Sequence, residues 1–204
     1  MEQDRVTLSS IFPAVYRARF AILTTACTYF VTIMIGIVMV QAGSGLALDA
    51  RDNLIKTARS SDPAALAFAR GNRLQAALID FSGNLLLGAV PNTVAGLGII
   101  TSYPLVAYRG WIGGIVSVND EHQSRLGQPS TAVYYIITLL LQLIPYSLAG
   151  GAGLQLGLVF YRQYSDTRVK KWLGIPKAAL LDVVHIYLLV IPLFLVASLW
   201  EFLA

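Results

Sequence analysis

Five polar side chains interrupt stretches of this sequence that are otherwise apolar: Arg109, Gln142, Asp182, His185 and Glu201. At the centre of a lipid bilayer a charged side chain costs about 2.5 kcal/mol or more, so it needs a partner or water. Asp80 is a sixth residue of this kind. Ionisable residues in apolar segments often form ion, solute or proton sites. The sequence therefore predicts a polar site inside the apolar part of the chain.

Arg109 has two interpretations. It is part of an ion or substrate site, or it pairs with Asp182 or Glu201 or reaches the membrane surface from a helix break. The second is the more common arrangement, because a guanidinium group cannot lose its proton and must be compensated.

Asp182 and His185 are three residues apart, so they share one face of a helix. They could form a proton relay or a ligand pair, but a packed and hydrogen-bonded His is the favoured interpretation. His122 is the one other His, and Cys27 is the single Cys. No two-His haem site within the last span, disulfide framework or cysteine-based metal site is expected. The sequence also lacks phosphate-binding, nucleophile-elbow and zinc-protease motifs, so we expect no enzyme activity and no cofactor.

The composition indicates which elements carry these residues. Apolar residues make up 56% and charged residues 13% of the 204 positions. Soluble domains have roughly 45–50% and 25%. Residues 20–40 and 132–161 each exceed the roughly 20 residues that span a bilayer. Such segments should be helical, because lipid cannot hydrogen-bond an exposed backbone.

We therefore predict an all-α, polytopic transmembrane bundle with about five spans. They are expected at 20–40, twice within 76–118, at 132–161 and at 178–202. Pro145 either kinks the fourth span or divides it, which would make six, and Pro192 kinks the last. A break between the second and third spans is expected at Pro91-Asn92 or at Pro104 to Gly110.

Residues 1–204 are predicted to form one membrane domain. Residues 1–19 form a cytoplasmic N-terminal segment, and residues 43–75 form an extramembrane loop with a short helix from Asp62-Pro63 to Gly71. Eight basic residues fall before the first span or after the fourth, which favours an inner (plasma) membrane protein with a cytoplasmic N-terminus. The basic excess therefore reflects topology, and no nucleic-acid partner is expected.

Small residues recur at four-residue spacing, which allows two helix backbones to approach closely. They form two groups: Gly110 with Gly114, and Ala149 with Gly153 and Gly157. Packing within the chain is the favoured interpretation, and a homodimer face is the alternative.

Three segments carry a resemblance to a known family. The first segment contains Phe81-Ser-Gly-Asn84, Gly96-Leu-Gly98 and Arg109-Gly110-Trp-Ile-Gly-Gly114. The second runs from Gln142 to Gly157, and the third from Ile191-Pro192 to Glu201-Phe202. Together they cover residues 81–203, which resemble the core of the stage II sporulation protein M family. Thr138, Leu139 and Gln142 stand where many relatives carry His-Gly and Glu, and Arg109-Gly110 stands where Asn-Gly is usual.

The resemblance implies a non-enzymatic membrane scaffold or complex subunit that binds the bilayer and other membrane proteins. The alternative is a small-solute or ion transporter or channel with a site near Arg109, because interrupted helices are typical of such sites.

Overall fold

The structure, a computed structural model, describes residues 8–166, 168–172 and 174–204. Its elements are, in chain order: η1 (Leu8–Ser10), α1 (Ile11–Gln41), α2 (Gly45–Ser61), α3 (Pro63–Ala69), α4 (Arg73–Ser82), the π-helix η2 (Gly83–Ala89), α5 (Val90–Ala95), η3 (Gly96–Gly98), α6 (Ser102–Ile115), η4 (Arg125–Gly127), α7 (Pro129–Gln163), β1 (Lys171–Trp172), β2 (Ile175–Pro176) and α8 (Lys177–Leu203). The two short strands pair antiparallel. The all-α prediction is confirmed.

Four helical segments are long and apolar enough to cross a membrane: α1, the run from α4 to η3, α7 and α8. This agrees with a multi-pass membrane protein. The predicted third span corresponds to α6, which has 14 residues. Such a helix is about 21 Å long and falls short of the roughly 30 Å hydrocarbon core. The structure therefore supports four spans by length and composition.

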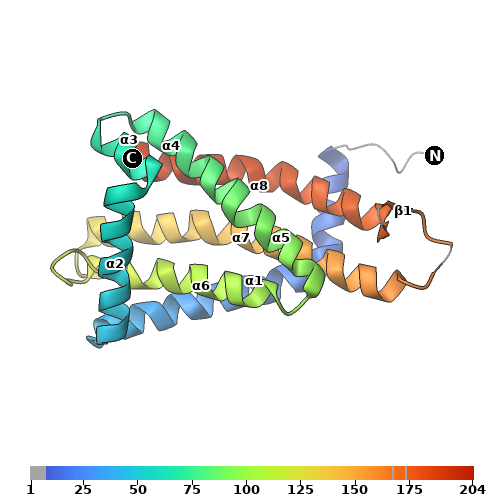
Figure 1. Cartoon of the computed structure of the whole chain (residues 1–204), viewed down its shortest axis with the longest axis horizontal. Coiled ribbons are helices and arrows are strands. Elements are labelled where there is room, and N and C mark those ends of the chain that lie inside the picture. Colours follow the sequence, from blue (N-terminus) through green and yellow to red (C-terminus); the bar gives the residue numbers. More distant parts are fainter. Residues whose placement is uncertain (1–7, 167, 173) are drawn as a thin grey trace.

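The long helices run roughly alongside one another, and the start of α1 and the end of α8 lie at opposite ends of the bundle (Figure 1). Helix α1 packs against α6 and α7, and α8 packs against α7 and α4. We call the end with the start of α1 and the β1–β2 hairpin the N-terminal end. The opposite end, with α2, α3 and residues 116–128, is the loop end; α2 lies across the bundle there (Figure 1).

The chain reverses direction between the two breaks predicted from sequence. Pro91 lies inside a continuous helical run, and Pro104 lies in the first turn of α6. The reversal occurs at residues 96–101, where η3 ends and Ile99 has a φ of 57°. Pro104 is tolerated because it lies in the first turn of α6, where its missing N–H is not needed. Pro91 directly follows the π-helix η2 and has no N–H to donate to the Leu87 carbonyl oxygen four residues earlier, which accepts a hydrogen bond from Arg109.

Helix α7 continues through Pro145 as a single helix, so the predicted division of this span does not occur. Helix α8 likewise continues through Pro192.

The region predicted as an extramembrane loop is more ordered than expected. The predicted short helix exists as α3, and the Asp62 side chain caps it by accepting hydrogen bonds from the Ala64 and Ala65 N–H groups. Helix α2 was not predicted. It forms because Ala47 and Arg51, one turn apart, are buried at the loop end, where Ala47 packs in a cluster with Ile115.

The predicted small residues all lie at contacts between helices of this chain. A Cβ on Gly110 would lie 2.5 Å from the Tyr29 carbonyl oxygen, and one on Gly114 would lie 2.2 Å from that of Ile33. On α7, Cβ atoms on Gly153 and Gly157 would lie 2.3 and 2.4 Å from carbonyl oxygens of α5 and η3, and Ala149 is fully buried. These contacts bring α6 against α1, and α7 against α5.

Candidate functional site

A cavity of about 290 Å³ lies among the helices towards the loop end. Side chains from α1, α4, η2, α6, α7 and α8 line it, and its rim includes Arg125 and Tyr134. We call it the polar cavity. Its polar lining residues besides the rim include Asp80, Asn84, Arg109, Gln142 and Tyr146, together with Glu201, which is also exposed at the loop end. A polar space of this size inside apolar helices is the main candidate for a functional site.

A chain of hydrogen bonds connects Arg109 to Asp80. The Arg109 Nη1 group donates to the Tyr146 hydroxyl at 2.6 Å, which donates to the Asn84 Oδ1 atom at 2.6 Å. The Asn84 Nδ2 group then donates to Asp80 Oδ2 at 2.9 Å. Every donation points from the cation towards the carboxylate, so each bond polarises the next. The chain therefore compensates the charges of Arg109 and Asp80 without direct contact between them.

Asp80 receives a second hydrogen bond, from the Ser198 hydroxyl on α8 at 2.6 Å. The Arg109 guanidinium also lies over the Tyr146 ring, 4.7 Å from its centroid. The ring is held in turn by an edge contact with the fully buried Phe194. Residues from four helical segments beside α6 thus position the Arg109 side chain.

The π-helix η2 shapes one wall of the cavity. A Cβ on Gly88 would lie 2.6 Å from the Tyr146 hydroxyl and 3.0 Å from Arg109 Nη2, so glycine is needed for this approach. The Leu87 carbonyl oxygen lies 3.4 Å from Arg109 Nη2 and accepts from it. Single π turns inside α-helices are frequent at functional sites, because they change the direction of nearby side chains.

The structure places Gln142 and Glu201 in the same cavity as Arg109, but gives Arg109 other partners. The Gln142 Nε2 group lies 3.5 Å from Glu201 Oε2, a long hydrogen bond. The Gln142 Oε1 atom is buried and has no hydrogen-bond partner within the described chain. Glu201 and Gln142 therefore keep hydrogen-bonding capacity towards the cavity.

Asp182 and His185 lie elsewhere, near the N-terminal end of α8. Asp182 accepts from Arg17 Nε at 2.8 Å and forms an ion pair with it, which joins α8 to α1. His185 is 4% exposed, and neither of its ring nitrogens has a hydrogen-bond partner among the residues that the structure describes. The hydrogen bond expected for this His is therefore not observed.

The sequence pointed to Arg109, Gln142 and Glu201 as site residues and to Asp80 as a charged residue in an apolar run, but it assigned no site role to Asn84 and Tyr146. Asp80 and Asn84 are four residues apart within an apolar run, hence on one helix face, and this spacing was a usable signal. Tyr146 had no such signal, because a tyrosine in an apolar helix is ordinary.

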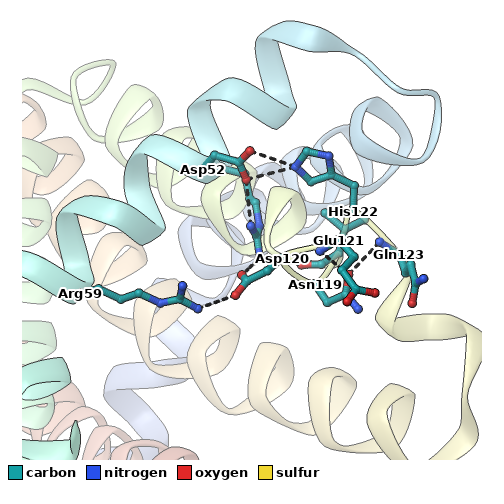
Figure 2. A network of polar contacts seen from close by, with 9 residues as sticks. Asp52, Arg59, Asn119, Asp120, Glu121, His122 and Gln123 are labelled. Carbon is teal, nitrogen blue, oxygen red and sulfur yellow. Dashed lines mark hydrogen bonds and ion pairs between the residues drawn. The ribbon is translucent and has the colours of Figure 1, made fainter.

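At the loop end a second polar network joins α2 to residues 117–125 (Figure 2). Asp120 accepts from Arg51 at 2.7 Å and from Arg59 at 2.6 Å, and Arg51 also reaches Asp52. Asp52 in turn bonds the ring of His122 at 3.0 Å, as Figure 2 shows. Arg51 is 2% exposed, so the network is anchored in the interior.

This network predicts a pH dependence. Hydrogen bonds from Arg59 and Arg51 lower the pKa of Asp120 to about 2, and those from Arg51 and His122 lower the pKa of Asp52. A carboxylate with a lowered pKa stabilises the folded state above its unfolded pKa of about 3.9, and this contribution is lost as the pH falls towards 2. We expect α2 to stay docked down to about pH 4 and to separate from the 117–125 segment between about pH 4 and 2.

Spin labels at Asn53 and Gln123, with the exposed Cys27 replaced by Ser, would report the distance between α2 and the loop. An Arg59→Gln protein should separate at a higher pH, because Asp120 loses the larger of its two pKa-lowering contacts. A distance that stays constant to pH 2 in both proteins would contradict this prediction.

Among the described residues, no group of three or more His, Cys, Asp and Glu side chains could hold a metal ion. No family model, curated protein or solved structure matches the chain. The resemblance to the stage II sporulation protein M family therefore stays a hypothesis.

Proposed function

We propose that this chain is a small-solute or ion transporter or channel whose site is the polar cavity. The observation that carries the proposal is the hydrogen-bond chain from Arg109 on α6 to Asp80 along the cavity wall, whose other members lie on helical segments of membrane length. Keeping a guanidinium among apolar helices is costly even when its charge is compensated. A packed bundle without solute traffic would gain more from apolar residues of the same volume.

The shape of the cavity also supports transport. Its rim at Arg125 and Tyr134 lies at the loop end. Towards the N-terminal end, α8 continues from the cavity with the buried Phe194, Val190 and Ile186. A cavity that opens at one end and is closed by packed side chains at the other is the arrangement expected of one state in alternating access.

The test is flux into liposomes that contain the purified protein. Osmotic swelling with urea, glycerol and glycine reports small solutes, and an internal pH dye reports protons. We expect wild-type vesicles to exceed empty vesicles for at least one probe. Arg109→Gln should lower that flux at least about tenfold, because it removes the cation that orients Tyr146. Wild-type flux equal to that of empty vesicles for every probe would overturn the proposal.

A matched control separates lost function from lost folding. Arg70 lies at the loop end outside the spans, so Arg70→Gln changes the net charge equally and should leave flux unchanged. Each variant is used only when its helix content and elution volume in detergent equal those of wild type.

The second candidate is a non-enzymatic membrane scaffold or complex subunit. The loop-end network favours it, because Arg51, Asp52 and Asp120 hold α2 and the 117–125 segment in a defined extramembrane surface. The family resemblance points the same way. Crosslinking in cells before gentle detergent extraction should then recover a membrane-protein partner, and substitution of Asp120 should reduce its yield. A protein that always purifies alone would oppose this candidate.

For topology, we propose that α6 makes a fifth pass although it is shorter than the hydrocarbon core, which local thinning of the bilayer accommodates. We also propose that the N-terminal end faces the cytoplasm at the plasma membrane. An odd number of passes agrees with the start of α1 and the end of α8 at opposite ends of the bundle (Figure 1). The described part of the N-terminal end, residues 8–19, 161–166, 168–172 and 174–182, carries seven basic and two acidic residues. Residues 45–75 and 116–128 at the loop end carry six basic and five acidic residues. Basic residues in short connections weigh most in setting the orientation, and the 116–128 connection carries only one, Arg125, which favours a cytoplasmic N-terminal end.

A further inference from the structure

The N-terminal end combines exposed aromatic rings with basic side chains. Six aromatic residues there are 59–82% exposed: Phe12, Tyr16, Phe20, Tyr161, Tyr164 and Trp172. Aromatic side chains with one apolar and one wet side concentrate where lipid headgroups meet hydrocarbon. These rings therefore mark the headgroup level of one leaflet.

Arg19 is oriented by two of these rings. Its guanidinium lies 3.8 Å from the centroid of Tyr16 and 4.7 Å from that of Phe20, and its Nη1 donates to the Tyr16 carbonyl oxygen. The structure gives Arg19 no carboxylate partner in its described part. A fixed guanidinium that keeps free N–H donors matches a phosphate group.

The hairpin supplies further cations at the same end. The Lys171 Nζ group donates to the Tyr164 carbonyl oxygen at 2.7 Å, and Lys170 lies beside it in the sequence. The Arg17–Asp182 ion pair joins the first turns of α1 to those of α8, which directly follows the hairpin. Figure 1 shows the hairpin and the start of α1 at the same end of the bundle.

We propose that this end forms a binding surface for anionic phospholipid headgroups, with Arg19, Lys170 and Lys171 contacting their phosphates. The charge of the surface is complementary to anionic lipid, and its rings lie at the depth of the headgroups. The loop end provides the contrast, because its basic residues are nearly balanced by acidic ones and several are paired with them. The proposal holds whether the protein is a transporter or a scaffold.

Trp172 makes a direct test possible, because Trp111 and Trp200 lie towards the loop end of α6 and α8. A Trp111→Phe/Trp200→Phe protein is placed in bilayers of phosphatidylcholine with brominated phosphatidylglycerol or brominated phosphatidylcholine. Bromine quenches nearby indole fluorescence, so the two titrations give the relative affinity for the anionic lipid. We expect the anionic lipid to be preferred at Trp172, and less so as salt is raised.

Arg19→Gln/Lys170→Gln/Lys171→Gln should lower this preference at least about tenfold, since each basic residue near an anionic surface contributes about fivefold. Lys56→Gln/Arg70→Gln/Arg73→Gln removes the same charge at the loop end and should leave it unchanged. Equal preference in wild type and the first triple variant overturns the proposal, as does no preference in wild type. Displacement of the lipid by inorganic phosphate also overturns it, because the surface would then bind free phosphate.

Should the two Phe substitutions prevent folding, native mass spectrometry of the wild-type protein replaces the fluorescence. Retention of phosphatidylglycerol over phosphatidylcholine must then be lost in the first triple variant and kept in the second. Equal retention of both lipids by wild type overturns the proposal in this format too.

Discussion

An Asp80→Asn protein is expected to unfold at a clearly lower temperature than wild type, although the two side chains have nearly the same shape. The substitution removes the negative charge at the end of the hydrogen-bond chain and leaves the Arg109 guanidinium without compensation. Losing one member of a buried charged pair costs about 3–5 kcal/mol. Because Asp80 and Arg109 are partly exposed to the cavity, we expect about 2–3 kcal/mol. The loss of stability is measured by thermal unfolding of both proteins in the same detergent, monitored by circular dichroism.

A double-mutant cycle tests whether the effect passes through the chain. Asp80→Asn combined with Arg109→Gln removes both charges, so the double variant should be more stable than the sum of the single changes predicts, by about 0.5–3 kcal/mol. Asp49→Asn on the exposed face of α2 is the matched control and should change the unfolding temperature little. Strictly additive effects of the two cavity substitutions would show that Arg109 and Asp80 are not coupled.

A Gly153→Leu substitution should prevent most of the protein molecules from folding correctly. The Cβ of any residue there would lie 2.3 Å from the carbonyl oxygen of Thr93 and 2.6 Å from its Cα. Both are backbone atoms, so the contact can be relieved only by moving α7 away from α5. Overpacking of a tight core costs about 1–3 kcal/mol or more, and Leu at a backbone contact should exceed this range. The yield of monodisperse protein in detergent and its unfolding temperature are the measurements.

The matched substitution is Gly45→Ala at the start of α2. A Cβ at this position has no atom within 4 Å, and the backbone has an ordinary helical conformation. It should leave stability unchanged or raise it by a few tenths of a kcal/mol. Gly153→Ala should fall between this control and Leu. A Gly153→Leu protein as stable as wild type would mean that α7 and α5 do not pack as described.

The predictions for Asp80 and Gly153 both depend on the packing of α7 against the helical run that contains η2 and α5. Gly153 sets how closely α7 approaches α5, and α5 continues the helical run that contains η2 and Asn84. Tyr146 lies two turns before Gly153 on α7 and bonds Asn84. Displacing α7 therefore disturbs the Tyr146–Asn84 contact, and Gly153→Ala should lower flux more than its effect on stability alone explains.

Sequence alone determined the elements whose causes are local. The apolar runs predict membrane-length helices, because bilayer thickness sets the number of residues needed. Helix α1 ends in the segment from Gln41 to Gly45, where Gly43 has a left-handed backbone conformation, and α3 starts at Asp62-Pro63, where Asp62 caps it. Both signals depend only on residues a few positions away in the chain. Close packing at Gly153 was also foreseen from residue size and spacing.

Only the tertiary structure decided which polar groups meet. Ser198 and Asp80 are 118 residues apart, and Arg109 and Tyr146 are 37 apart. Their contact depends on how far each helix is rotated and shifted against its neighbours, and hydrophobic periodicity does not specify this within an almost uniformly apolar helix. The same reason explains why Arg17 rather than Arg109 pairs with Asp182, since the two helix ends meet only after the bundle has packed.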